Sequence, residues 1–278
     1  MNVPHGVTAG LVAAGLGDHA AMSGLPRRSG ARLTATHVGT ATVVLEIGGL
    51  TLITDPVFDG PMAYRCGSSV LEHTGGPAVA LADLPPVDAV LLSHDDHPDS
   101  LDEAGRTLLH GRPVLTTVPA AARLGDGAVG LEAWSVHELT VRDRTLRITA
   151  TPCVHGRCVE VVGFVIEVPG EDEAVYVSGD TVDFGELDEI GRRFTIGTAL
   201  LHLGAAVVDE FDPGRLLTLD GRQGAALAST LGAHTVVPLN YASWSHFTEG
   251  RAEIGAAFTD AGLAHRLRWL TPGVPEAL

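Results

Sequence analysis

Short apolar runs alternate with polar and Gly/Pro-rich stretches along the chain from Leu33 onward. Residues 33–58 contain two β-rich runs, and the Gly48–Gly49 pair between them is typical of a hairpin turn. The run VDAVLLSH, residues 87–94, is apolar up to its polar end, which predicts a short buried strand. The same reasoning predicts strands at 112–118, 131–137, 139–151, 159–167, 174–181, 197–204, 234–240 and 266–270.

Helical patterns separate several of these strands. Pro119 in a first turn and Gly125 after the last turn predict a short helix between them. Asp99 or Ser100 is expected to cap a helix that reaches about residue 110. Other predicted helices lie at 184–193, 220–231 and 248–262, whereas 61–86 has irregularly spaced Gly and Pro and is predicted to be a loop.

The order of these elements predicts the fold class. A β-rich stretch is followed by alternating strands and helices, and this succession occurs twice. It predicts an α/β fold in which two β-sheets pack together with helices outside. We expect one domain over 31–278, because no linker interrupts the pattern, and an N-terminal arm over 1–30 that is loosely ordered or forms a short helix.

Composition narrows the classes of partner. The 34 acidic and 18 basic residues give a formal net charge of −16, which argues against a nucleic-acid binder. No apolar run reaches the roughly 18 residues of a membrane span. Three cysteines, Cys66, Cys153 and Cys158, do not suit a disulfide framework and indicate a reducing, cytoplasmic compartment. A small-molecule substrate is the expected partner, and the oligomeric state stays open.

Candidate chemistry gathers where predicted strands end, the position at which open α/β sheets carry their sites. Side chains two apart on an extended segment point the same way, so His94 with Asp96, or Asp95 with His97, can bind one ion together. Imidazole and carboxylate groups suit Zn²⁺, Fe²⁺ or Mn²⁺. The five polar clusters are TDP at Asp55, SHDDHPD at His94 to Asp99, TPCVHG at His155, SGDT at Asp180 and PLNYASWSH at Asn240 to His246.

Taken in order, these segments resemble the metallo-β-lactamase-fold hydrolases. The resemblance covers HVGTATVVLEIGGLTLITDP, LLSHDDHPDSLD, TPCVHG, VYVSGDT and VPLNYASWSHFTEG, and it is closest to the branch with ascorbate-phosphate lactonase-like and phospholipase-D-like members. It extends over roughly residues 33–273. It implies an αββα sandwich with one or two metal ions at the sheet ends.

The second motif departs from the family pattern His-x-His-x-Asp-His. Here the chain is one residue longer, and the resemblance leaves two placements open: His94 with Asp96, or His94 with His97, as the first two metal ligands. Both placements make Asp99 the aspartate of the motif, and both put Ser100, a poor ligand, where a histidine is expected.

The later motifs are partly kept. His155 matches the histidine of the third motif, Asp180 matches the bridging aspartate, and Asn240 stands where a final histidine is expected. Asp55 corresponds to an aspartate that orients a ligand without binding metal. The ligands that remain suffice for one ion more readily than for two, with Zn²⁺ as the expected metal and Mn²⁺ or Fe²⁺ as alternatives.

The resemblance implies a metal-dependent hydrolase that acts on a small-molecule ester, lactone, amide or phosphodiester through a metal-activated water. Asp99 or Asp180 is expected to orient that water or take its proton, and His246 or Asn240 to stabilise the developing charge. Trp244 is expected either to pack in the interior or to line the substrate pocket. Two alternatives stay open: a non-hydrolytic lyase, isomerase or cyclase with one altered metal site, and a metal-free binding protein.

Overall fold

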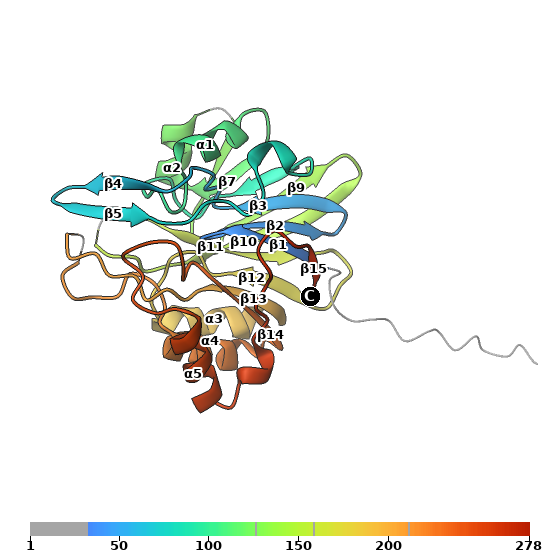
Figure 1. Ribbon diagram of the computed structural model, residues 1–278. Coiled ribbons are helices and arrows are strands. Elements are labelled where there is room, and N and C mark those ends of the chain that lie inside the picture. The colour runs from blue at the N-terminus through green and yellow to red at the C-terminus, as the bar shows by residue number, and fades with distance from the viewer. Residues whose placement is uncertain (1–32, 126, 158, 211) are drawn as a thin grey trace, which may run out of the picture.

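Two large β-sheets pack face to face, and the helices lie on their outer faces (Figure 1). The computed structural model describes residues 33–278, except 126, 158 and 211. The prediction of an αββα sandwich is confirmed. The arm predicted for residues 1–30 lies outside the described residues.

The first sheet has seven strands in the order β15-β1-β2-β3-β6-β7-β8. Its strands β1 to β3 are antiparallel, and β3, β6, β7 and β8 run parallel. The predicted turn at Gly48–Gly49 joins β2 to β3, with φ of 58° and 81°. The strands are Thr34–Gly39 (β1), Thr42–Ile47 (β2), Leu50–Thr54 (β3), Ala89–Leu91 (β6), Val114–Thr117 (β7), Ala128–Leu131 (β8) and Glu276–Ala277 (β15).

The second sheet has six strands in the order β14-β13-β12-β11-β10-β9. The single strand predicted over 139–151 is wrong: a turn at Arg142, with φ of 57°, divides it between the antiparallel strands β9 and β10. The predicted strand 131–137 spans the end of β8 and the start of β9. The strands are Val136–Val141 (β9), Arg144–Pro152 (β10), Val162–Glu167 (β11), Ala174–Val177 (β12), Ile196–His202 (β13) and Thr235–Leu239 (β14).

The helices divide between the two outer faces. Figure 1 shows α1 and α2 beside the first sheet and α3, α4 and α5 beside the second. The α-helices are Glu103–Arg106 (α1), Val118–Leu124 (α2), Asp188–Arg193 (α3), Gly221–Leu231 (α4) and Arg251–Asp260 (α5), and 3₁₀ turns lie at Leu81–Asp83, Thr107–Leu109, Gly185–Leu187 and Ala264–Arg266. Among the residues that the structure describes, no helix is long and apolar enough to cross a bilayer.

Two local predictions are corrected at the ends of helices. The helix expected from Asp99 or Ser100 begins later, because Asp102 is its N-cap and accepts a hydrogen bond from the backbone N–H of Gly105 at 2.6 Å. The closing strand predicted over 266–270 does not form; Leu267 makes one isolated bridge with Val236 after a 3₁₀ turn.

The loop predicted over 61–86 contains a two-stranded hairpin, Met62–Cys66 (β4) and Ser69–His73 (β5). Its first strand is largely exposed, so β4 shows no alternation of apolar and polar residues. Leu71 and His73 of β5 point inward, where they pack near Trp244. Tertiary contacts, which the local pattern did not reveal, hold this hairpin in place.

Apolar side chains from both sheets form the central core. Leu45, Leu52, Leu91 and Leu115 from the first sheet meet Phe164, Ile166 and other residues of the second, and the six named side chains are at most 1% exposed. Removing such a side chain from water stabilises the fold by about 1.5–3 kcal/mol. This core fixes the two sheets against each other and thereby fixes where their strands end.

Candidate metal centre

The polar clusters predicted at strand ends meet at one edge of the sandwich. His94 follows β6 of the first sheet, whereas His155, Asp180 and Asn240 follow β10, β12 and β14 of the second. The parallel strands of each sheet end on the same side, and the shared core brings the two edges together. The residues are therefore neighbours although 146 positions separate His94 from Asn240 (240 − 94).

Three histidines form the centre of this edge, and we call His94, His97 and His155 the histidine cluster. One ring nitrogen from each lies within 4.8 Å of the others. His94 Nε2 is 3.0 Å from His97 Nδ1, and His155 Nε2 is 3.2 Å from the same atom. His94 and His155 are buried, and His97 is partly exposed.

Contacts on the far side of two rings determine which nitrogens face the centre. His155 Nδ1 donates to the carbonyl oxygen of Leu217 at 2.7 Å, which leaves the lone pair of Nε2 pointing inward in the neutral ring. His94 Nδ1 contacts the Ser93 hydroxyl at 2.9 Å. Such hydrogen bonds on the outer nitrogen orient metal-binding histidines in proteins.

Burial keeps two of the rings neutral. Desolvation is the main cause that lowers the pKa of His94 well below its ordinary value, and the neighbouring His97 ring lowers it further. Burial likewise lowers the pKa of His97, although the Asp99 carboxylate opposes the shift. Metal binding requires neutral imidazole, so burial prepares both rings as ligands.

The spacing of the histidine cluster fits one metal ion. Tetrahedral coordination with Zn–N distances of about 2.0–2.1 Å places neighbouring ligand atoms roughly 3.3 Å apart. Two of the three nitrogen–nitrogen distances, 3.0 and 3.2 Å, are close to that spacing, and the third lies within 4.8 Å. The single inward nitrogen of His97 cannot donate a linear hydrogen bond to both neighbours at once. A cation bound among them would be coordinated by all three nitrogens.

Of the two placements that the sequence left open, the structure brings His94 and His97 together. Asp96 lies outside the cluster, because its carboxylate contacts the Arg123 guanidinium at 2.8 Å. Asp95 is buried and also pairs with Arg123, and its carbonyl oxygen accepts from Arg106 at 3.2 Å. The longer motif therefore turns both aspartates away from the histidines and anchors them on two arginines.

A second group of polar residues lies beside the cluster: Asp99, Asp180 and their partners His246, His202 and Asn240, which we call the carboxylate side. Asp180 Oδ1 accepts from His202 Nδ1 at 2.7 Å and from Asn240 Nδ2 at 2.9 Å. Burial raises the pKa of Asp180, but the hydrogen bond and charge of His202 outweigh it and hold that pKa well below its ordinary value. Asp180 is therefore an anion in the interior.

Asp99 is paired in a similar way. Its Oδ2 lies 3.2 Å from His246 Nε2, and both residues are less than 9% exposed. Burial raises the pKa of Asp99, and the His246 contact more than compensates and lowers it below its ordinary value. His246 thus occupies the neighbourhood of the motif aspartate, where the chain lacks a histidine at position 100. Ser100 instead lies 3.4 Å from His94 Nε2 through its hydroxyl.

Asp55 and Trp244 have supporting roles in the structure. Asp55 Oδ1 accepts the backbone N–H of Ser93 at 2.6 Å, which holds the segment that leads into the cluster. Burial raises the pKa of Asp55 to about 7. Trp244 is packed in the interior: its ring stacks on His73 with centroids 4.6 Å apart, and its Nε1 donates to Thr40. This geometry favours the packing role among the two that were expected for Trp244.

A small cavity of about 190 Å³ opens beside the histidine cluster. His97 and His155 form one wall, and Leu217 and Val159 provide apolar surface. Arg157 and Glu210 add opposite charges at its border, and Arg157 is paired with Asp212 at 3.1 Å. A small polar group can reach the two histidines through this cavity.

Sequence reasoning did not identify several residues that support the site. Ser93 and Arg123 contact the motif loop, and the Leu217 carbonyl orients His155. Arg123 and Leu217 lie far along the chain from their partners, and a backbone carbonyl has no signature in sequence. His202 holds Asp180 through a hydrogen bond of 2.7 Å.

Comparison with known proteins agrees with this geometry. The model of the β-lactamase superfamily domain matches residues 51–241. A protein of Nitratidesulfovibrio vulgaris named a metal-dependent hydrolase is 28% identical over 248 residues, which cover 84% of this chain and 91% of that protein. A protein of Caldivirga maquilingensis named a metal-dependent hydrolase is 26% identical over 211 residues, which cover 73% of this chain and 80% of that protein.

Solved structures show the same fold. A metallo hydrolase of Ignicoccus hospitalis, Igni18, has a TM-score of 0.70 and 23% identity, with 88% of this chain and 98% of that chain covered. An isothiocyanate hydrolase from Delia radicum gut bacteria has a TM-score of 0.74 and 23% identity, with coverages of 88% and 99%.

The α/β sandwich and the histidine cluster at its strand ends define a metallo-hydrolase type of enzyme. The chain belongs to the β-lactamase superfamily. Within that superfamily it is an enzyme of the metal-dependent hydrolase class.

Proposed function

We propose that the histidine cluster holds one divalent cation and that the chain hydrolyses a small-molecule ester, lactone, amide or phosphodiester. The convergence of three ring nitrogens, two of them 3.0 and 3.2 Å from the third, carries this proposal. Imidazole ligands favour Zn²⁺, with Mn²⁺ and Fe²⁺ as alternatives. Asp180 is the proposed fourth ligand, because its Oδ2 accepts neither of the hydrogen bonds that end on Oδ1.

When bound, the cation supplies a water of lowered pKa, near 7, and polarises the scissile carbonyl or phosphoryl group. The residues of the carboxylate side complete the chemistry. Asp99 is anionic and close to the cluster, so it can orient the attacking water and accept its proton. His202 and Asn240 hold Asp180 in one orientation. In this arrangement Asp99 takes part in proton transfer, and Asp180 is a metal ligand that His202 and Asn240 hold in place.

Asn240 and His246 are the proposed contacts to the substrate. Asn240 Oδ1 and His246 Nδ1 are buried and make no hydrogen bond to the described residues. A buried polar atom without a partner costs about 1–3 kcal/mol, which a substrate group can recover by bonding to it. Asn240 also has a left-handed backbone, with φ of 52°, a strained conformation of the kind that clusters at functional sites.

The first experiment measures metal content by mass spectrometry on untagged protein prepared without chelator. Wild type is expected to carry about one equivalent of Zn, Mn or Fe, and His155→Ala less than a tenth as much. His265→Ala, an exposed histidine outside the site, is the control and should match wild type. A metal content below a tenth of an equivalent in reconstituted wild type would contradict the proposal.

A second measurement tests the reaction class. Turnover of a hydrolysed substrate in ¹⁸O-labelled water is expected to place one labelled oxygen in the product. Conversion of a substrate without label uptake would replace hydrolysis by the lyase, isomerase or cyclase alternative while leaving the metal site intact.

A further inference from the structure

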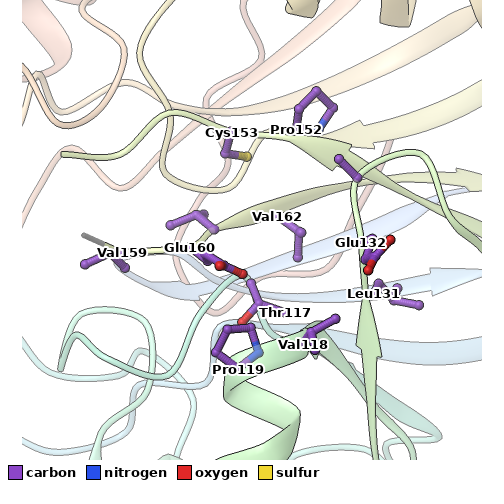
Figure 2. Close-up of a pocket in the computed structure, with 12 residues that line it drawn as sticks. Thr117, Val118, Pro119, Leu131, Glu132, Pro152, Cys153, Val159, Glu160 and Val162 are labelled. Carbon is purple, nitrogen blue, oxygen red and sulfur yellow. The ribbon is translucent and has the colours of Figure 1, made fainter. Parts of the chain in front are cut away.

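A second, larger hollow lies next to the small cavity. It has a volume of about 520 Å³ and opens between the two sheets, where α2 and β8 of one layer face β10 and β11 of the other (Figure 2). Figure 2 shows Pro119 and Val118 on one side, Cys153 and Pro152 on the opposite side, and Val162 between them. We call this hollow the inter-sheet groove. Its volume lies within the range of about 300–1,000 Å³ typical of small-molecule sites.

Residues with apolar side chains form most of the lining of the inter-sheet groove, whereas polar and apolar atoms share its exposed surface about equally. Val118, Leu131, Val161 and other apolar residues make up eight of the twelve lining side chains, counted as Val118, Pro119, Leu131, Ala133, Pro152, Val159, Val161 and Val162. Val118 keeps 46% of its surface exposed at the wall of the groove, so its side chain is accessible to a ligand there.

Charge in the inter-sheet groove has one sign only. Glu132 and Glu160 are the charged residues among those that line it, and none of its described lining residues is Lys or Arg. Both carboxylates are exposed, so they lie in water at the border of the groove. An anionic ligand would be repelled here, whereas a neutral apolar group would not.

Val159 connects the inter-sheet groove to the histidine cluster. The same residue lines both the groove and the 190 Å³ cavity beside His97 and His155. Val159 also forms an antiparallel bridge with His155, across a tight turn in which Gly156 has φ of 62°. The backbone therefore fixes Val159 relative to a proposed metal ligand, and Val159 divides the two hollows.

We propose that the inter-sheet groove binds the neutral, apolar arm of the substrate while its scissile group lies at the histidine cluster. This proposal deepens the proposed function. Binding of an apolar arm in the groove is independent of that function, whereas the position of the scissile group at the histidine cluster rests on it. The substrate class is thereby narrowed to elongated molecules with a small reactive end and an uncharged hydrophobic arm, and Val159 becomes a residue that determines specificity.

The first test measures binding without catalysis. N-phenyl-1-naphthylamine, a neutral apolar dye, is titrated into the metal-loaded wild type and followed by fluorescence, with anionic 8-anilinonaphthalene-1-sulfonate in parallel. Wild type is expected to bind the neutral dye at least tenfold more tightly than the anionic one. Val118→Trp, which fills the groove, should weaken binding of the neutral dye about tenfold or more, since each excluded methylene changes affinity about fourfold.

Val274→Trp is the matched control, because Val274 is also 46% exposed and lies outside the groove lining. It should bind the neutral dye within twofold of wild type. Ala133→Trp, at a second exposed position of the lining, gives an independent block if Val118→Trp does not fold. The groove would be ruled out as the binding site if wild type, Val118→Trp and Ala133→Trp bound the neutral dye with equal affinity. An equal loss of affinity in Val274→Trp and in the two groove variants would rule it out as well.

The second test links the groove to the reaction. Hydrolysis of p-nitrophenyl acetate and p-nitrophenyl octanoate is compared, and Val118→Trp is expected to lower the octanoate-to-acetate ratio of kcat/KM at least tenfold. An unchanged ratio would overturn the link to the scissile group. If neither ester is hydrolysed, ester hydrolysis as the proposed function is contradicted. The dye titration still decides whether the groove binds an apolar group, because it does not depend on catalysis.

Discussion

The histidine cluster and the carboxylate side adjoin each other, yet they satisfy their polar atoms in different ways. In the cluster, His94 and His155 both direct Nε2 toward one nitrogen of His97. On the carboxylate side, Asp180 and Asp99 are each matched by a histidine, at 2.7 and 3.2 Å. In the first region three ring nitrogens converge on one point, whereas in the second each carboxylate has a histidine partner, and Asn240 Oδ1 and His246 Nδ1 make no hydrogen bond to the described residues.

The difference between the two regions follows from the two positions at which the chain departs from the histidines that the family resemblance implies. Positions 100 and 240 carry Ser and Asn where the family resemblance implies histidines, and the tertiary structure supplies His246 and His202 from elsewhere as hydrogen-bond partners of Asp99 and Asp180. Among the described residues, one group of metal-capable side chains converges, the histidine cluster. Hence we expect one ion, with Asp180 as its proposed fourth ligand and Asp99 as the proposed acceptor of the water proton.

The largest effect is expected from breaking the carboxylate side. His202→Ala removes the partner of Asp180, whose side chain is only 2% exposed, and leaves an anion poorly compensated in the interior. The free energy of unfolding should fall by about 3 kcal/mol or more. Urea denaturation of metal-free protein measures it, with His234→Ala as the control, because His234 pairs with Glu173 at the surface. A loss below 1 kcal/mol would contradict a structural role for the pair.

The same pair predicts a pH dependence. Burial lowers the pKa of His202, but the hydrogen bond and charge of Asp180 raise it above its ordinary value of 6.5. The contribution of the charged ring to stability is therefore fully present below pH 6.5 and decreases as the pH rises through the raised pKa. The stability difference between wild type and His202→Ala should accordingly be larger at pH 6 than at pH 9 (roughly half a unit below and well above the ordinary histidine value).

An intermediate effect is expected on the stabilisation by metal, which should differ between variants of the histidine cluster and variants of the carboxylate side. A metal at about 100 times its Kd should stabilise wild type by about 2.7 kcal/mol, which thermal unfolding with and without Zn²⁺ detects. His97→Ala should abolish most of that gain, and His246→Ala should retain it, because His246 contacts Asp99 and lies outside the cluster. Equal losses in both variants would show that the two regions act as one metal site.

The smallest effect is expected on metal affinity when Arg123, which pairs with Asp95 and Asp96, is replaced. Arg123→Ala frees Asp95 and Asp96, which lie between two proposed ligands, and should weaken metal affinity about tenfold, in the range found for residues that orient ligands. Arg123→Lys keeps the charge without the planar fork and should restore part of the affinity. Arg147→Ala, in a similarly exposed ion pair, is the control for a general effect of losing an arginine.

Local chain properties account for the elements that the sequence predicted well. The helix between Pro119 and Gly125 and the turn at Gly48–Gly49 depend on backbone preferences of those residues, and both form as predicted. The hairpin β4–β5 was missed because its strands are stabilised by distant residues, Trp244 among them. The start of α1 was misplaced because Asp99 is engaged with His246, which is 147 positions away (246 − 99), and cannot cap the helix.

By itself, the sequence determined that two sheets pack together with helices outside and where the strands that lead to His94, His155 and Asp180 end, because periodicity and strand-ending signals are local. The resemblance to the metallo-β-lactamase-fold hydrolases added the αββα order. The sequence also determined that a metal motif had been altered. Only the tertiary structure decided that His97, and not Asp96, joins His94, because an ion pair between Asp96 and a distant arginine makes that choice. The pairing of Asp180 with His202 and of Asp99 with His246 was likewise decided in three dimensions, since each buried carboxylate takes whichever donor the fold brings within reach.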